Sequence, residues 1–196
     1  MKQVNSNRRR FLTIATSFVA GVGLTMVAVP FLGYWKPSER AKSSAAPITV
    51  NFSKIEVGSM ITVSWQGKPV WILRRTQENL DYLRQEQHRA SLRDPDSKVN
   101  QQPDYARNEF RSKNDEIFIA VGICTHLGCV PLYKPDGNVD NSNALYFCPC
   151  HGSKFDLAGR VYKGVPAPTN LIIPPYRFLD NSLVEIGVDE STVSSV

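Results

Sequence analysis

The sequence Cys-Thr-His-Leu-Gly-Cys at residues 124–129 and the sequence Cys-Pro-Cys-His-Gly-Ser at residues 148–153 decide what this chain can be. Together these two boxes contain all four cysteines and two of the three histidines of the 196-residue protein. Thiol and imidazole side chains gathered so densely are typical of a metal site. We therefore expect both boxes to contribute to one inorganic centre, which carries the function of the chain.

The charge of the chain is divided unevenly. The formal net charge is +5, but residues 1–35 contain four basic residues and no acidic one, whereas residues 36–196 contain the other 19 basic and all 18 acidic residues. A nucleic-acid-binding domain concentrates basic residues on its folded surface. The nearly neutral second part argues against nucleic acid as a partner, and the total length suits one globular domain with appendages.

The amino-terminal segment has the composition of a membrane-spanning helix. No charged residue occurs from Phe11 to Trp35, a stretch long enough to cross a hydrocarbon core of about 30 Å at about 1.5 Å per residue. Three arginines, residues 8–10, precede it directly. By the positive-inside rule, the amino terminus lies in the cytoplasm and the remainder of the chain lies on the other side of the membrane.

Residues 7–12, Asn-Arg-Arg-Arg-Phe-Leu, also resemble the twin-arginine (Tat) export signal. That pathway exports folded proteins, so it suits a chain that acquires a metal centre in the cytoplasm and works outside. The apolar run is longer than the core of a usual signal peptide. We predict that residues 1–36 are retained as an anchor, that residues 37–47 form a flexible hinge linker, and that residues 48–196 form the folded domain.

Short β-prone segments follow the linker and predict a mainly antiparallel β fold. Both boxes are then expected on loops that leave adjacent strands. Thr76 is expected to cap a helix that runs toward His88, within a polar insertion that ends near Asn114. Because His88 has no second ligand nearby in the sequence, we expect it at the solvent-exposed surface. The expected strands are residues 48–52, 60–65, 70–74, 117–123, 145–147 and 171–173, with a hairpin of 176–179 and 183–186 and a turn region at 134–143.

The side chains of the two boxes suit two kinds of metal centre. Thiolates and neutral imidazoles bind zinc, and they also bind an iron–sulfur centre in which two cysteines hold one iron and two histidines hold the other. From their number alone, the four cysteines could form two disulfides, two ligand pairs, or one of each. A structural zinc module on a membrane tether is the alternative that is not an enzyme.

Taken together with the anchor, the linker and the stretch Gly-Val-Pro-Ala-Pro at residues 164–168, the boxes resemble those of Rieske [2Fe-2S] proteins. The resemblance is specifically to the membrane-anchored iron–sulfur subunits of bacterial quinol–cytochrome c oxidoreductases, the cytochrome bc1 complexes, and it covers nearly the whole chain. It implies a Rieske-type β-sandwich with a small cluster-binding subdomain at about residues 120–170, one transmembrane helix, and one [2Fe-2S] cluster as the cofactor.

The resemblance assigns the metal ligands. Cys124 and Cys148 would bind the inner iron, and His126 and His151 would bind the outer iron, which faces solvent. In relatives the histidine of the second box, here His151, is the one that contacts the quinol. Neutral imidazoles in place of two thiolates remove negative charge, which is why such clusters have high reduction potentials.

The same resemblance implies roles for residues around the ligands. It implies a disulfide between Cys129 and Cys150, which requires an oxidising compartment such as the periplasm. Leu127 would lie near the cluster tip and help to form the docking surface. The other residues expected around the cluster are Ser153, a hydrogen-bond donor to the cluster; Phe155, which stands where many high-potential relatives have tyrosine; and Gly164, Pro166 and Pro168 of the shielding loop.

The function expected from the resemblance is electron transfer in a respiratory chain. The chain would take one electron and one proton from a quinol, with ubiquinol as the expected one, and pass the electron to cytochrome c1. Its partners would be cytochrome b and cytochrome c1 in the bacterial inner membrane, and it would not be a complete enzyme alone. The alternative is the exported Rieske small subunit of arsenite oxidase, or another exported Rieske electron carrier.

Overall fold

The computed structural model describes residues 5–44, 46–136 and 145–189, so residues 137–143 of the turn region expected at 134–143 lie outside the described residues. The chain divides into two compact units, residues 1–43 and 44–196.

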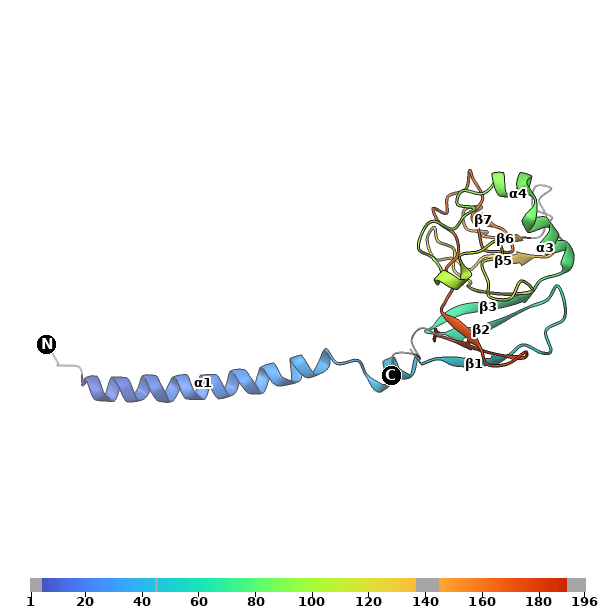
Figure 1. The fold of residues 1–196 in the computed structure, drawn as a ribbon. Helices are drawn as coiled ribbons and strands as arrows, with labels where there is room; N and C mark the ends of the chain where they lie inside the picture. Colours follow the sequence, from blue (N-terminus) through green and yellow to red (C-terminus); the bar gives the residue numbers. More distant parts are fainter. Residues whose placement is uncertain (1–4, 45, 137–144, 190–196) are drawn as a thin grey trace. The chain divides into compact units, whose positions relative to one another are not determined.

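The first unit is dominated by one long helix, α1, from Ser6 to Tyr34 (Figure 1). The Asn5 side chain caps it by accepting a hydrogen bond from the Arg8 backbone N–H at 3.3 Å. The helix is long and apolar enough to cross a membrane, and its described residues are not buried against protein. A short helix, α2, covers Glu39–Ser44 within the segment expected to be a linker.

The second unit consists mostly of three small antiparallel sheets, in the strand orders β1-β9-β8, β2-β3-β4 and β5-β6-β7. In Figure 1 the sheet of β5, β6 and β7 lies toward one end of this unit, close to α3 and α4, and β1 and β2 lie toward the other end. The predicted fold class, mainly antiparallel β with one amino-terminal helix, is confirmed. The strands are β1 (Ile48–Asn51), β2 (Met60–Trp65), β3 (Lys68–Arg74), β4 (Ile117–Val121), β5 (Leu132–Lys134), β6 (Leu145–Phe147), β7 (Lys154–Phe155), β8 (Tyr176–Phe178) and β9 (Leu183–Ile186).

The expected strands are mostly present, with one difference that matters for the site. The strand before the first box, β4, and the strand before the second box, β6, belong to different sheets. The prediction that the boxes leave adjacent strands is therefore wrong. The two short segments β5 and β7, which the sequence pattern did not indicate, flank β6 and build its sheet.

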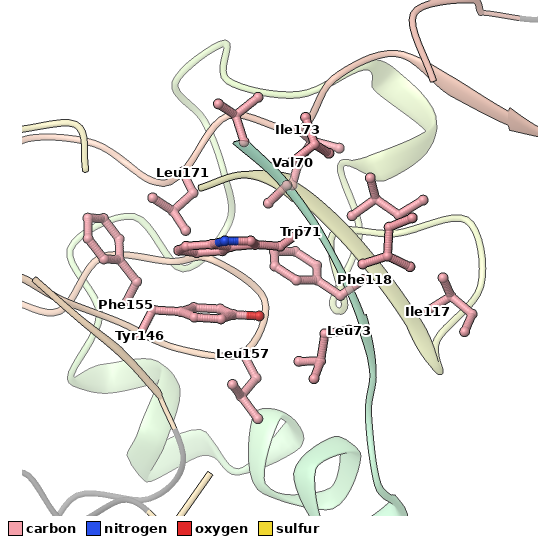
Figure 2. Packing of buried hydrophobic residues seen from close by; sticks show 14 of the residues in the cluster. Val70, Trp71, Leu73, Ile117, Phe118, Tyr146, Phe155, Leu157, Leu171 and Ile173 are labelled. Atoms are coloured by element: carbon pink, nitrogen blue, oxygen red, sulfur yellow. The ribbon is translucent and has the colours of Figure 1, made fainter. Parts of the chain in front are cut away.

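Stacked aromatic rings join these two sheets. The Trp71 indole of β3 lies parallel to the Tyr146 ring of β6, with ring centroids 4.7 Å apart, and Phe118 of β4 stacks on the same tyrosine at 6.2 Å (Figure 2). Gly122, directly after β4, lies against the indole so closely that an added Cβ would be 2.2 Å from Trp71 Cε2. The aromatic stack therefore needs glycine at this position, two residues before the first cysteine.

A polar insertion connects β3 to β4 and contains α3 (Gln77–Arg84), α4 (Glu86–Ala90) and the 3-10 helix η1 (Asp104–Ala106). As predicted, Thr76 caps α3: its hydroxyl accepts from the Asn79 N–H, and the Asn79 side chain accepts from the Thr76 N–H. The prediction that His88 is exposed is wrong, because its side chain is 1% accessible. The buried partner of His88 is Asp156, 68 residues further along the chain. The sequence around His88 therefore gave no sign that it is buried.

Candidate metal centre

The two boxes fold into loops that are closed in the same way. In the first loop, the Cys124 N–H donates to the Cys129 carbonyl at 2.7 Å, and the Gly128 N–H donates to the Cys124 carbonyl at 3.0 Å. Gly128 has φ +86°, a conformation that favours glycine. Each loop therefore turns back on its own leading cysteine.

The second loop repeats this pattern with different residues. The Cys148 N–H donates to the Ser153 carbonyl at 2.8 Å, and the Gly152 N–H donates to the Cys148 carbonyl at 2.9 Å. Gly152 has φ +76°. Since both leading cysteines are held at the base of a tight loop, both thiols are buried.

A disulfide between Cys129 and Cys150 links the two loops. This is the pairing that the family resemblance implied. The sulfurs of Cys129, Cys148 and Cys150 lie within 4.8 Å of one another, so the disulfide lies directly beside one of the free thiols. Cys124 and Cys148 remain as the two cysteines that can bind metal.

The two histidines of the boxes lie together at the accessible side of the loops. The ring centroids of His126 and His151 are 4.8 Å apart and the rings are almost perpendicular, at 87°. His126 is half-buried and His151 is exposed. Leu127, beside them, is 71% exposed. Of the four expected ligands, the two thiols are therefore buried, and the two imidazoles lie side by side and more accessible.

The surroundings of Cys124 affect the charge of its thiol. Burial raises the pKa of Cys124, and the neighbouring Cys148 raises it further, whereas hydrogen bonds from the His126 backbone and the Ser153 hydroxyl lower it. Binding of a metal cation would favour the thiolate form of Cys124, because a thiol loses its proton when it coordinates a metal.

A third loop, residues 164–168, and Thr169 directly after it are tied to the two boxes by hydrogen bonds. The Ala167 N–H donates to the Ser153 hydroxyl oxygen at 3.0 Å. The Thr125 hydroxyl donates to the Thr169 carbonyl at 2.6 Å. Thr125 and Thr169 were not among the residues predicted for the site, since a threonine next to a cysteine carries no distinctive pattern.

The remaining predicted residues occupy different environments. Phe155 is fully buried in the core, on β7. Gly164 has φ +72° and is exposed, as are Pro166 and Pro168. The third loop therefore presents its prolines to solvent and its Ala167 to the interior, where the hydrogen bond to Ser153 forms.

These side chains fit a binuclear iron–sulfur cluster. Two buried thiols on one side and two accessible imidazoles on the other match the two-cysteine, two-histidine donor set in which each iron has its own ligand type. The protein is thus of a class that can hold a mixed thiolate and imidazole metal centre.

Comparisons with known proteins agree with this class. The family model for the Rieske [2Fe-2S] domain matches residues 49–177, and the model for the ubiquinol–cytochrome c reductase Fe-S subunit TAT signal matches residues 1–38. A ubiquinol–cytochrome c reductase iron–sulfur subunit of Allochromatium vinosum is 46% identical, over 96% of this chain and 92% of its own. The subunit of the same name from Bradyrhizobium diazoefficiens is 41% identical, over 92% of this chain and 94% of its own.

A solved chain titled "Hyperthermophilic respiratory Complex III" is 27% identical, with a TM-score of 0.48, over 87% of this chain and 98% of that one. On the matches in sequence, the chain belongs to the Rieske family of ubiquinol–cytochrome c reductase iron–sulfur subunits. The cofactor of this family is the [2Fe-2S] cluster that the resemblance implied.

Replacing both Cys129 and Cys150 with alanine should lower the free energy of unfolding by about 3 kcal/mol, because the disulfide no longer restricts a loop of the unfolded chain. The two cysteines are 21 residues apart. Urea unfolding of the full chain in detergent measures the change. A reductant should lower the free energy of unfolding of the parent and leave that of the double variant unchanged. A double variant as stable as the oxidised parent would contradict a stabilising role for the disulfide.

Proposed function

We propose that this chain is the iron–sulfur subunit through which a quinol–cytochrome c oxidoreductase takes single electrons from quinol. In this proposal Cys124 and Cys148 bind the inner iron of one [2Fe-2S] cluster, and His126 and His151 bind the outer iron. The observation that carries the proposal is the pair of imidazoles that lie 4.8 Å apart at the accessible side, above two buried thiols.

The bound cluster supplies a one-electron acceptor, with a reduction potential in the range of roughly −150 to +300 mV for its class. The residues of the chain do the rest. The exposed imidazole of His151 accepts a hydrogen bond from the quinol hydroxyl and receives its proton, which a thiolate ligand could not do as well near neutral pH. The buried thiols and the third loop keep water from the inner side.

The proposed partners follow from the anchor and from the accessible tip. The quinol, with ubiquinol as the expected one, would meet His151 at a site on cytochrome b, and cytochrome c1 would receive the electron. Leu127, 71% exposed beside the imidazoles, would contribute apolar surface to this docking. The arginines of residues 8–10 support an amino terminus in the cytoplasm, a helix across the bacterial inner membrane and a domain in the periplasm.

Electron paramagnetic resonance of dithionite-reduced membranes tests the proposal. We expect a Rieske spectrum that changes when an inhibitor occupies the quinol site, because the imidazoles then face a different partner. A colourless protein that contains zinc, or four thiols that are all free, would exclude the cluster. A Rieske spectrum that is insensitive to the inhibitor would point to a different electron donor, such as the partner of an arsenite oxidase.

Replacing Phe155 with tyrosine should raise the midpoint potential of the cluster by roughly 40 mV, the equivalent of ~1 kcal/mol on the one-electron scale. Phenylalanine cannot donate a hydrogen bond, whereas a tyrosine hydroxyl directed at a cluster ligand would stabilise the more negative reduced state. A redox titration measures the shift. Phe178→Tyr, in β8 of another sheet, is the matched control, and an unchanged potential in Phe155→Tyr would contradict the prediction.

Residues 37–47 are proposed as a hinge that lets the cluster domain move between cytochrome b and cytochrome c1. Deleting residues 40–43, which lie in α2, should slow quinol–cytochrome c turnover several-fold and leave the spectrum of the cluster unchanged. A variant with glycine and serine at the same four positions keeps the length and serves as the control. Full turnover in the deletion variant would refute the hinge.

A further inference from the structure

His88 is a buried histidine outside the two boxes. Its Nε2 lies 3.1 Å from Asp156 Oδ2, and both side chains are almost inaccessible, at 1% and 0%. A carboxylate can only accept hydrogen bonds, so Nε2 carries the proton and donates. The His88 ring also packs on Tyr82 of α3 at 4.3 Å and on Tyr162 at 5.7 Å. The pair therefore fixes α4 to a segment 68 residues further along the chain.

Asp156 uses its other oxygen to shape the chain that follows the second box. Oδ1 accepts the backbone N–H of Ala158 at 2.9 Å and of Arg160 at 2.7 Å. The backbone closes the same turn, because the Asp156 N–H donates to the Arg160 carbonyl and the Gly159 N–H donates to the Asp156 carbonyl, both at 2.9 Å. The carboxylate that His88 holds is thus the centre of the turn at residues 156–160.

Asp156 keeps its negative charge in this interior position. Burial alone would raise its pKa, but the hydrogen bond from His88 and the charge of Arg160 hold the pKa below the ordinary value. The Arg160 guanidinium lies 3.9 Å from Oδ2. His88 Nδ1 has no hydrogen-bond partner among the described residues. Among the described residues, the His88 imidazole therefore makes one directed hydrogen bond, and that bond is to the carboxylate.

The chain that leaves this turn pairs with the end of α4. The Arg93 N–H donates to the Val161 carbonyl, and the Lys163 N–H donates to the Ser91 carbonyl, both at 2.9 Å. The Arg93 side chain reaches the Val165 carbonyl, also at 2.9 Å. Residues 91–93 therefore position residues 161–165, which lead into the loop at residues 164–168.

That loop ends at the hydrogen bond that reaches the metal centre. The Ala167 N–H donates to the Ser153 hydroxyl oxygen at 3.0 Å. The Ser153 hydroxyl lowers the pKa of the Cys124 thiol, so it lies beside that thiol. Residues 153–167 thus form a closed loop, with Ser153 at the metal side and Asp156 at the side where His88 holds it.

We propose that His88 is a positioning residue for the cluster site: through Asp156 it holds residues 156–167 so that the Ala167 N–H orients the Ser153 hydroxyl toward Cys124. This inference rests on the proposed function in taking Cys124 as a cluster ligand. A hydrogen bond to a ligand sulfur raises the reduction potential. Loss of the His88 contact therefore lowers the potential, although His88 touches neither the cluster nor the quinol.

The experiment compares three substitutions in the full-length, cluster-loaded chain in detergent. His88→Leu removes the hydrogen bond to Asp156, and His88→Gln keeps an N–H donor at the ε position. Gln87→Ala, at the neighbouring exposed position of α4, is the matched control. Hydrogen exchange followed by mass spectrometry reports the Ala167 amide, and a redox titration reports the midpoint potential.

We expect His88→Leu to exchange the Ala167 amide at least tenfold faster and to have a lower midpoint potential than the parent. His88→Gln should restore both values, and Gln87→Ala should change neither. A His88→Leu protein that unfolds more easily but keeps the parental Ala167 exchange and potential would reduce the pair to a stability contact and overturn the proposal. Equal defects in the Gln and Leu variants would overturn it as well.

If the leucine variant does not fold, His88→Asn replaces it, because the shorter amide keeps the polarity of the site but does not reach Asp156. The exchange rate of the Ala167 amide and the midpoint potential then show whether His88 positions the cluster site or only stabilises the fold. Failure of the proposed function is recognised separately, by a parent protein without a Rieske spectrum. The exchange of the Ala167 amide still tests the hydrogen-bond pathway in that case, because the amide reports on the protein chain itself.

Discussion

A metal centre that exchanges electrons with a partner has to keep water from its inner side and still offer accessible ligands on its outer side. In this chain one constraint meets both needs: two loops close on their own leading cysteines in the same way and are joined by the Cys129–Cys150 disulfide. Closing each loop buries Cys124 and Cys148 at its base. The loop residues that follow then carry His126 and His151 to the accessible side.

The loops can meet only because the sheets behind them are held at a fixed spacing. The strands β4 and β6, which lead into the boxes, come from different sheets. The stack of Trp71 on Tyr146 fills the space between those sheets, and Gly122 leaves room for the indole. Since a protein core tolerates little change in volume, this aromatic contact sets where the two loops emerge. The disulfide then fixes a separation that the core has already established.

The sequence allowed local features to be predicted well and long-range partners poorly. The Thr76 cap and the hairpin of β8 and β9 were predicted because their signals lie within a few neighbouring residues. The ligand candidates were identified because cysteine and histidine are rare and were concentrated in two boxes. The burial of His88 could not be predicted, since its partner Asp156 is 68 residues away and neither residue occurs in a recognisable pattern.

The polar insertion between β3 and β4 shows why such errors arise where they do. Few of its residues are apolar, so hydrophobic burial alone cannot attach it to the rest of the domain. Hydrogen bonds from buried arginines contribute the attachment. Arg75 donates to the carbonyls of Phe110 and Leu157, and Arg111 donates to those of Ala158 and Leu171.

Burial lowers the pKa of Arg75 to about 10 and that of Arg111 to about 9, so both guanidinium groups stay charged at neutral pH. A buried charge is tolerated only when its donors are satisfied. Three of the backbone carbonyls that accept from these two guanidinium groups, those of residues 157–159, belong to the turn that Asp156 organises. The insertion, the turn and the third loop therefore depend on one polar network behind the metal centre, and hydrophobic periodicity in the sequence carries no trace of such a network.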